Sequence, residues 1–146
     1  LGVFAGKLTE PLAKVLGNLG AYDAMVVHGE DGLDEITITD GTRVSRYANN
    51  AVENFFVSPE DFGIKRGKLV DLVGADKDAN ARITISILNG EKGPKRDVVL
   101  MNSSAALVVA GKAKDFRNGA EIAAEAIDSG KAIKKLEEIK KVTNSL

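Results

Sequence analysis

The stretch that decides the fold runs Ala24-Met25-Val26-Val27-His28-Gly29-Glu30-Asp31-Gly32-Leu33-Asp34-Glu35. Its apolar run at residues 24–27 predicts a short strand buried on both faces, and Gly29 closes that strand. The segment before it predicts an amphipathic helix, which begins at Thr9 as N-cap and stops at Gly20. The apolar stripe of that helix consists of Leu12, Val15, Leu16 and Leu19. A helix followed by a buried strand predicts an α/β fold class.

The residues after this stretch predict an antiparallel meander inserted into the α/β fold. Residues 36–39 alternate apolar and polar side chains, and Asp40-Gly41 is a hairpin turn signal that leads into a second extended run around Val44. Asn49-Asn50 forms a second turn before the extended residues 52–57. We therefore expect three antiparallel strands.

The rest of the chain predicts a carboxy-terminal helical cluster. Ser58-Pro59-Glu60-Asp61 begins a short helical turn that ends at Gly63. Longer helices are predicted over 78–89, 97–111, 116–128 and 131–142. The helix over 97–111, which Pro94 introduces, is apolar almost all round and is therefore expected to be buried at the centre. The helix over 78–89 is expected to bury Ala79, Ile83, Ile87 and Leu88.

The composition describes one globular unit, which we expect to span residues 1–146. The chain is 44% hydrophobic and carries a formal net charge of -1. It contains no cysteine, which excludes disulfide scaffolds, thiolate zinc sites and cysteine nucleophiles and fits a cytoplasmic location. No apolar run approaches the roughly 20 residues that cross a bilayer, so we expect no membrane association. The chain starts at Leu1 without an initiator methionine, and we expect a fragment of a longer protein.

The acidic loop after the buried strand is the strongest candidate site. It carries Glu30, Asp31, Asp34 and Glu35 at the carboxyl end of a strand, where open α/β sheets bind ligands. Close carboxylates suit Mg²⁺, which takes one or two of them together with waters and substrate phosphates. The adjacent pair Asp34 and Glu35 is the predicted metal-ligand pair. A solvated acidic turn is the alternative, and the pyrophosphoryl-sugar signature of ordinary phosphoribosyltransferases matches only loosely.

Other chemically active residues have simpler structural interpretations. His28 is the only histidine, so histidine chemistry would depend on it, although a strand-end residue is the simpler interpretation. Ser103 and Ser104 lie in a predicted buried helix, where small polar residues permit close packing, and no second histidine is available to activate them. The lysines of residues 131–141 alternate with Glu137 and Glu138, as on a solvated helix face. We do not expect nucleic acid as a partner.

Five segments, in order along the chain, closely resemble the carboxy-terminal half of the anthranilate phosphoribosyltransferase family of the tryptophan pathway. They are residues 1–4, 26–36, 59–63, 89–97 and 102–107. The string His-Gly-Glu-Asp-Gly-Leu-Asp-Glu at 28–35 is the most specific of them. The resemblance covers essentially the whole chain.

This resemblance implies a glycosyltransferase that joins the ribose-5-phosphate of phosphoribosyl pyrophosphate (PRPP) to the amine of anthranilate and releases pyrophosphate. It implies the large α/β domain of the nucleoside phosphorylase and phosphoribosyltransferase type of fold. It also implies a homodimer for the intact enzyme, and Mg²⁺ held by Asp34 and Glu35 against the pyrophosphate. It assigns no catalytic residue to this chain and leaves its substrate-binding residues unknown.

Several family features do not occur in this sequence. They are the Gly-Thr-Gly-Gly-Asp phosphate-binding turn, the Lys-His-Gly-Asn segment, the arginine that meets anthranilate, and the small amino-terminal helical domain. We therefore expect the isolated chain to be inactive. Two alternatives stay open: a nucleic-acid-binding relative of the same fold, and a pyrimidine nucleoside phosphorylase-like enzyme.

Overall fold

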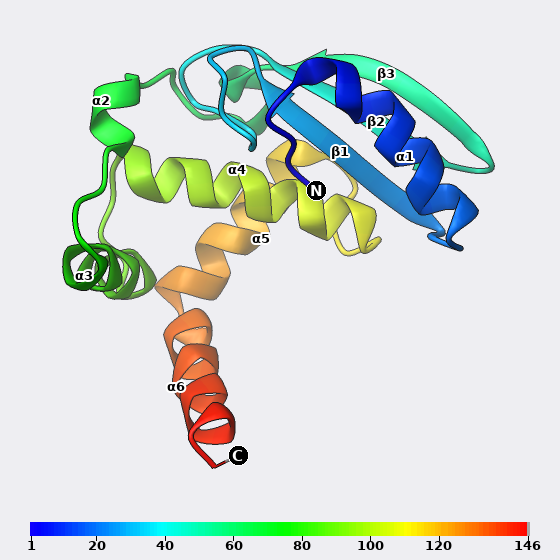
Figure 1. Ribbon diagram of the computed structural model, residues 1–146. Helices are drawn as coiled ribbons and strands as arrows, with labels where there is room; N and C mark the ends of the chain where they lie inside the picture. Colours follow the sequence, from blue (N-terminus) through cyan, green and yellow to red (C-terminus); the bar gives the residue numbers. More distant parts are fainter. Residues whose placement is uncertain (146) are drawn as a thin grey trace.

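The computed structural model describes residues 1–145 and places helices on both faces of a three-stranded sheet (Figure 1). Helix α1 (Thr9–Asn18) covers one face. Helices α4 (Pro94–Val109) and α5 (Phe116–Asp128) lie beneath the other face, and α6 (Lys131–Thr143) extends away from them. The predicted α/β fold class, with an antiparallel sheet and a carboxy-terminal helical cluster, is confirmed. Across residues 1–145, none of the helices combines the length and apolar character that a membrane span requires.

The sheet is an antiparallel meander of β1 (Asp23–Gly29), β2 (Thr42–Ala48) and β3 (Ala51–Val57). Val44 in the central strand lies opposite Val27 on one side and Phe55 on the other. The predicted turn at Asn49-Asn50 joins β2 to β3, and both asparagines have positive φ angles, 51° and 62°. Two successive residues of positive φ match the right-handed twist of the strands, and asparagine tolerates that conformation.

The amino-terminal segment covers the outer edge of β1. Gly2 forms a parallel bridge with Val27, and the Val3 amide donates to the Val27 carbonyl at 3.0 Å. The Val27 amide donates to Leu1 at 2.9 Å, and the terminal ammonium of Leu1 donates to Met25 at 2.9 Å. Strand β1 is therefore paired on both sides, which agrees with its continuous apolar sequence.

The predicted strand over residues 36–39 is wrong. Strand β2 pairs with β1 instead, and residues 36–39 lie in the loop that joins them. Their backbone groups bind side chains and a distant loop: the Thr37 amide donates to Thr42 Oγ1 at 3.1 Å, and Ile38 accepts from the Gly67 amide at 2.9 Å. Because Ile36, Thr37 and Ile38 are all buried, the alternating sequence does not place one face in solvent.

The predicted N-cap of α1 is also wrong. A 3₁₀ turn over Gly6–Leu8 precedes the helix, so Leu8 occupies the cap position and Thr9 is the first helical residue. The Thr9 hydroxyl donates to the Gly6 carbonyl at 2.9 Å. The predicted stop at Gly20 agrees with its φ of 95°.

The other helices follow the sequence more closely. A 3₁₀ turn over Pro59–Phe62 has the predicted capping by Ser58 and ends at Gly63. Helix α3 (Lys77–Leu88) and helices α5 and α6 begin and end within one residue of the predicted bounds. Helix α4 begins three residues before the predicted start, because Pro94 is its first residue, and ends two residues before the predicted end. The short helix α2 (Leu69–Leu72) was not predicted. The expected buried side of α3 is only half-buried, because a single helix edge packs against its neighbours.

Helix α4 is central but not enclosed. Its buried residues face the sheet and α5, and they are Arg96, Leu100, Met101, Ser104 and Ala105. Ala106, one position further along, is exposed. The predicted burial of this helix is therefore found only on the face towards the sheet and α5, because residues 1–145 cover only part of the circumference of α4.

Candidate functional site

The four acidic residues of the predicted site lie in the loop from β1 to β2, but they have different surroundings. Asp34 and Glu30 are exposed, whereas Glu35 and Asp31 are half-buried. Asp34 and Glu35 both line a cleft of about 490 Å³; Asp31 and Glu30 do not. The structure therefore separates the adjacent pair from the other two acids.

Asp31 organises the loop. Its carboxylate accepts from the Leu33 amide at 3.2 Å, from the Thr37 hydroxyl at 2.6 Å and from the Thr39 hydroxyl. Burial alone would raise the pKa of Asp31, but these hydrogen bonds outweigh it and the pKa is lowered. The hydrogen bonds of the loop thus favour the ionised form of Asp31.

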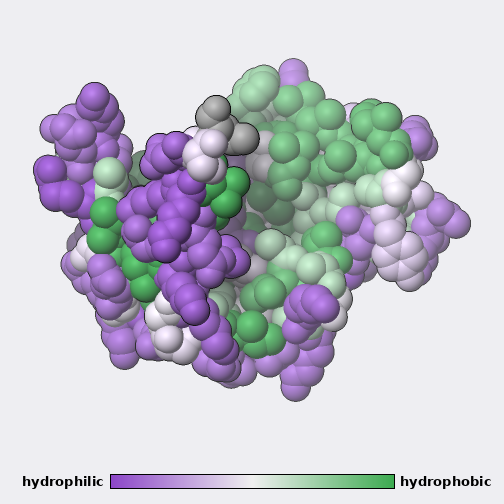
Figure 2. Space-filling model, turned by 90° about the horizontal axis from the view of Figure 1, so that it is seen from below, coloured by the Kyte–Doolittle hydropathy of each residue, from purple (hydrophilic) through white to green (hydrophobic). Residues whose placement is uncertain are grey.

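The cleft lies between the amino-terminal segment, β1 and the second half of α4. Its mostly apolar lining consists of Leu1, Gly2, Leu16, Ala21, Asp23, Ala24, Met25, Val27, Asp34, Glu35, Ile36, Asn102, Ala105, Ala106 and Val109. Seen from below, the molecule carries a broad apolar area on one side, beside a hollow (Figure 2). The acidic pair is therefore a charged group beside an apolar cavity.

Two residues outside the loop hold the acidic pair in place. Gly2 packs against the Asp34 peptide so closely that a Cβ on Gly2 would lie 2.5 Å from the Asp34 carbonyl carbon. From the other side, Asn102 of α4 binds the backbone of Ile36 and approaches the Glu35 carboxylate at 3.3 Å. Sequence reasoning gave neither residue an individual role, although a lone asparagine in an apolar helix is a signal for a buried polar contact.

The electrostatics of the pair suit a cation. Burial raises the pKa of Glu35, and the negative charges of Asp34 and Asp31 raise it further. Within residues 1–145, no group of three or more His, Cys, Asp or Glu side chains is arranged to hold a metal ion. Two carboxylates suit Mg²⁺, which completes its octahedral coordination with waters and phosphate oxygens. They are too few for a site in which protein groups supply every ligand.

His28 faces away from the cleft. Its Nδ1 lies 2.8 Å from the Val3 carbonyl oxygen, so Nδ1 carries the proton and donates. Gly6 packs against the ring, and the cleft lining does not include His28. The structural interpretation of His28 as a strand-end residue therefore agrees with its contacts.

The remaining candidates also have structural partners. The Ser104 hydroxyl donates to the Phe116 carbonyl at 2.6 Å and packs against Gly119 of α5, as expected for close helix packing. A second cleft of about 420 Å³ lies between α3 and the start of α4. Its buried Arg96 is already bound to Asp128 at 2.8 Å and to the Gly90 carbonyl at 3.1 Å, so that cation holds the fold together.

Comparison with known proteins agrees with this geometry. The model of the glycosyl transferase family, a/b domain, matches residues 1–133. The chain belongs to this family. The glycosyl transferase a/b match includes the whole sheet, α4, α5 and the acidic loop.

Curated proteins similar to this chain include anthranilate phosphoribosyltransferases. The enzyme of Methanobrevibacter smithii is 49% identical over 145 residues, which are 99% of this chain and 43% of that protein. The enzyme of Acetivibrio thermocellus is 50% identical over 145 residues, which are 99% of this chain and 42% of that protein. The chain therefore spans about two fifths of the length of the relatives it matches.

Solved structures of the same family share the fold. The anthranilate phosphoribosyltransferase of Thermus thermophilus superposes with a TM-score of 0.86 at 36% identity, over 94% of this chain and 40% of that one. The Saccharomyces cerevisiae enzyme in complex with PRPP and Mg superposes with a TM-score of 0.89 at 27% identity, over 100% of this chain and 42% of that one. The same yeast enzyme has been solved with 4-fluoroanthranilate.

Proposed function

We propose that residues 1–146 form one unit, the carboxy-terminal part of the α/β domain of an anthranilate phosphoribosyltransferase. The intact enzyme would transfer the phosphoribosyl group of PRPP to anthranilate in tryptophan biosynthesis and release pyrophosphate. The observation that carries this proposal is the acidic pair beside an apolar cleft, in a chain 49% identical to relatives of that name. The yeast relative solved with PRPP and Mg supports it.

Within this proposal, Asp34 and Glu35 hold Mg²⁺ through their carboxylate oxygens. Bound there, the ion would offset the negative charge that develops on the departing pyrophosphate. The chain's own residues position these carboxylates: Gly2 lets the amino-terminal segment approach Asp34, and Asn102 holds the backbone that follows Glu35.

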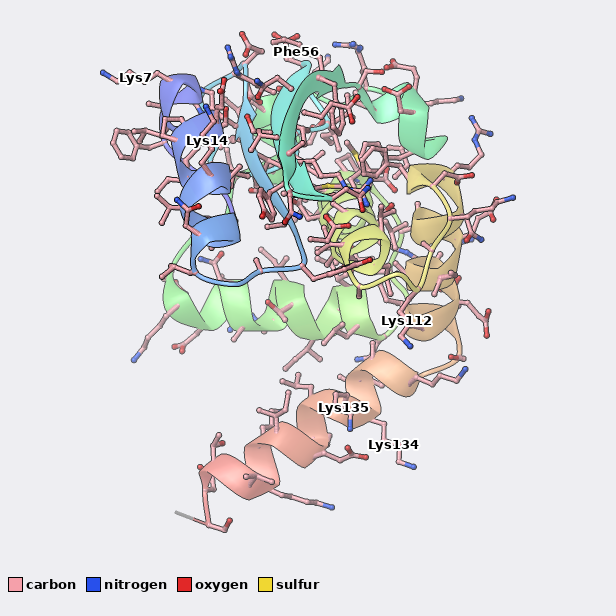
Figure 3. All side chains as sticks on the ribbon, turned by 90° about the vertical axis from the view of Figure 1, so that its right-hand side faces the viewer. Lys7, Lys14, Phe56, Lys112, Lys134 and Lys135 are labelled. Atoms are coloured by element: carbon pink, nitrogen blue, oxygen red, sulfur yellow. The ribbon has the colours of Figure 1, made fainter. Side chains whose placement is uncertain are left out.

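The proposal includes a homodimer in the cytoplasm and no nucleic acid partner. A continuous basic face along the last helices would favour the nucleic-acid-binding alternative. Lys134 and Lys135 project from α6 (Figure 3), but two lysines of this helix pair with its acids. Lys135 pairs with Glu138, and Lys140 pairs with Glu137 at 2.7 Å. These pairs interrupt the basic face and support the enzyme.

Substitution of the pair tests the function. In the intact enzyme, Asp34→Asn and Glu35→Gln each remove one negative charge at constant size and should lower the rate on the order of 10²-fold. Excess Mg²⁺ should restore part of that loss, because weakened metal binding is the cause. Glu30→Gln is the matched control, since Glu30 is in the same loop but outside the cleft lining. Wild-type kinetics in both Asp34 and Glu35 variants across a Mg²⁺ titration would leave the loop a solvated acidic turn.

The isolated 146-residue chain should not form phosphoribosyl anthranilate, because it lacks the family's donor-binding turn. Anthranilate fluorescence should stay constant when the chain is mixed with PRPP and Mg²⁺. A steady, PRPP-dependent loss of fluorescence above a protein-free blank would contradict this proposal and place the active site within these residues.

A further inference from the structure

Asn102 joins helix α4 to the loop that carries the acidic pair, across 66 positions of sequence. Its side-chain Oδ1 accepts from the Ile36 amide at 3.0 Å, and its Nδ2 donates to the Ile36 carbonyl at 2.9 Å. Because a backbone amide can only donate, the carboxamide atom that faces the Ile36 N–H must be the oxygen, and this fixes the orientation of the carboxamide. One side chain therefore satisfies both backbone groups of the residue that follows Glu35.

The same amide nitrogen reaches two more acceptors. Nδ2 donates to the Val98 carbonyl, one turn earlier on α4, at 2.9 Å, and to Glu35 Oε2 at 3.3 Å. The bond to Val98 ties the carboxamide to its own helix, and the bond to Glu35 ties it to a carboxylate of the pair. Two hydrogens thus serve three acceptors, and the longest contact is the one to Glu35.

The surroundings of this contact make it rigid. Ile36 is only 1% exposed, so its backbone groups have no ready access to water if Asn102 is lost. Helix α4 is anchored in turn against the sheet by Met101, which is fully buried. The position of the acidic loop is therefore fixed relative to the hydrophobic core.

From this geometry we propose that Asn102 is a positioning residue for the metal-binding carboxylates. It holds the Glu35-Ile36 backbone and orients the Glu35 carboxylate, and it does not bind the metal itself. This inference rests on the proposed function, in which Asp34 and Glu35 hold Mg²⁺. Partners that orient metal ligands typically change metal affinity by about 10- to 100-fold when they are removed.

Mn²⁺ binding to the intact enzyme tests this inference without an activity assay. With pyrophosphate present, Mn²⁺ should broaden the amide NMR signals of residues 33–37 first. Asn102→Ala should raise the apparent dissociation constant about 10-fold or more. The matched control is Ser104→Ala, which removes another buried hydrogen bond from α4, on the side facing α5, and should change the constant less than about twofold.

The Asp34→Asn variant separates the two proposals. If it leaves Mn²⁺ binding unchanged, or if the wild-type intact enzyme binds no Mn²⁺, the metal site itself is wrong and the role of Asn102 falls with it. If Asp34→Asn weakens binding and Asn102→Ala does not, only the positioning role is overturned.

A measurement on the wild-type intact enzyme covers the case in which Asn102→Ala does not fold. The side-chain NH₂ group of Asn102 lies beside Glu35. Its NMR signals should therefore broaden at the same low Mn²⁺ concentration as the signal of the Ile36 amide. Sharp Asn102 side-chain signals at a concentration that erases those of the acidic pair would overturn the inference.

Discussion

Gly119 sets the separation of α4 and α5, and its replacement by alanine tests how tightly these helices pack. A Cβ at Gly119 would lie 2.9 Å from Ser104 Cα, whereas ordinary van der Waals contact is 3.4–4 Å. The obstacle is the backbone of α4, which cannot rotate away. The two helices must therefore separate by about half an ångström, and the contacts between Leu100 and Ala123 loosen with them.

The expected magnitude follows from two opposed terms. An extra methyl group in a packed contact typically costs about 1–3 kcal/mol. Replacing glycine by alanine inside a helix contributes about 1 kcal/mol in the other direction. The net of these two terms is a loss, and we expect Gly119→Ala to lower the free energy of unfolding by up to about 2 kcal/mol. This corresponds to a fall in Tm of up to about 8 °C in a domain of this size.

Thermal and urea unfolding followed by circular dichroism measure this change. The matched control is exposed Glu121 in the same helix, where the alanine variant should be more stable than the glycine variant by about 1 kcal/mol. If Gly119→Ala raises stability as that control does, the close approach of α4 and α5 is not a packing constraint and the reasoning fails.

Two further predictions concern the loop and the cleft. The pKa of Asp31 is lowered in the folded state, so its stabilising contribution is present above the unfolded pKa of about 3.9 and is lost as pH falls through the folded value. Asp31→Asn should therefore lower Tm at pH 7, and its difference from wild type should shrink below about pH 4; a constant difference would contradict this. Leu19 and Tyr22 are 79% and 88% exposed, and the cleft is lined mostly by apolar residues, so the isolated chain should bind ANS and self-associate. A single monomer peak in the ultracentrifuge without an ANS signal would contradict this.

Helix positions were well predicted from the sequence because their signals are local. Residues 116–128 and 131–142 were predicted from their apolar period, and the observed helices differ by at most one residue. The turn at Asn49-Asn50 was predicted because its positive φ angles depend on the side chains at those two positions. The acidic loop was recognised in the same way, from four carboxylates within six residues.

The strand over residues 36–39 shows where local signals fail. Apolar and polar residues do alternate here, but the backbone of Ile36 binds Asn102. The Thr37 amide donates to Thr42, and the Thr37 hydroxyl donates to Asp31. These bonds satisfy the groups that a strand partner would take, so the segment folds as a loop. A pattern of apolar and polar residues does not reveal which distant side chain will bind a backbone group.

The residue types of the site were thus determined by the sequence, and their relative positions by the tertiary structure. The sequence by itself determined that Asp34 and Glu35 are adjacent, acidic and just beyond an apolar strand. Only the tertiary structure brings Gly2 of the amino-terminal segment and Asn102 of α4 against them, and turns Asp31 and His28 towards other partners. The physical reason is that helix periods, caps and turns involve neighbours within a few residues, whereas these contacts join positions 32 and 66 residues apart. The first forms only when the amino-terminal segment lies along β1, and the second only when α4 packs beneath the sheet.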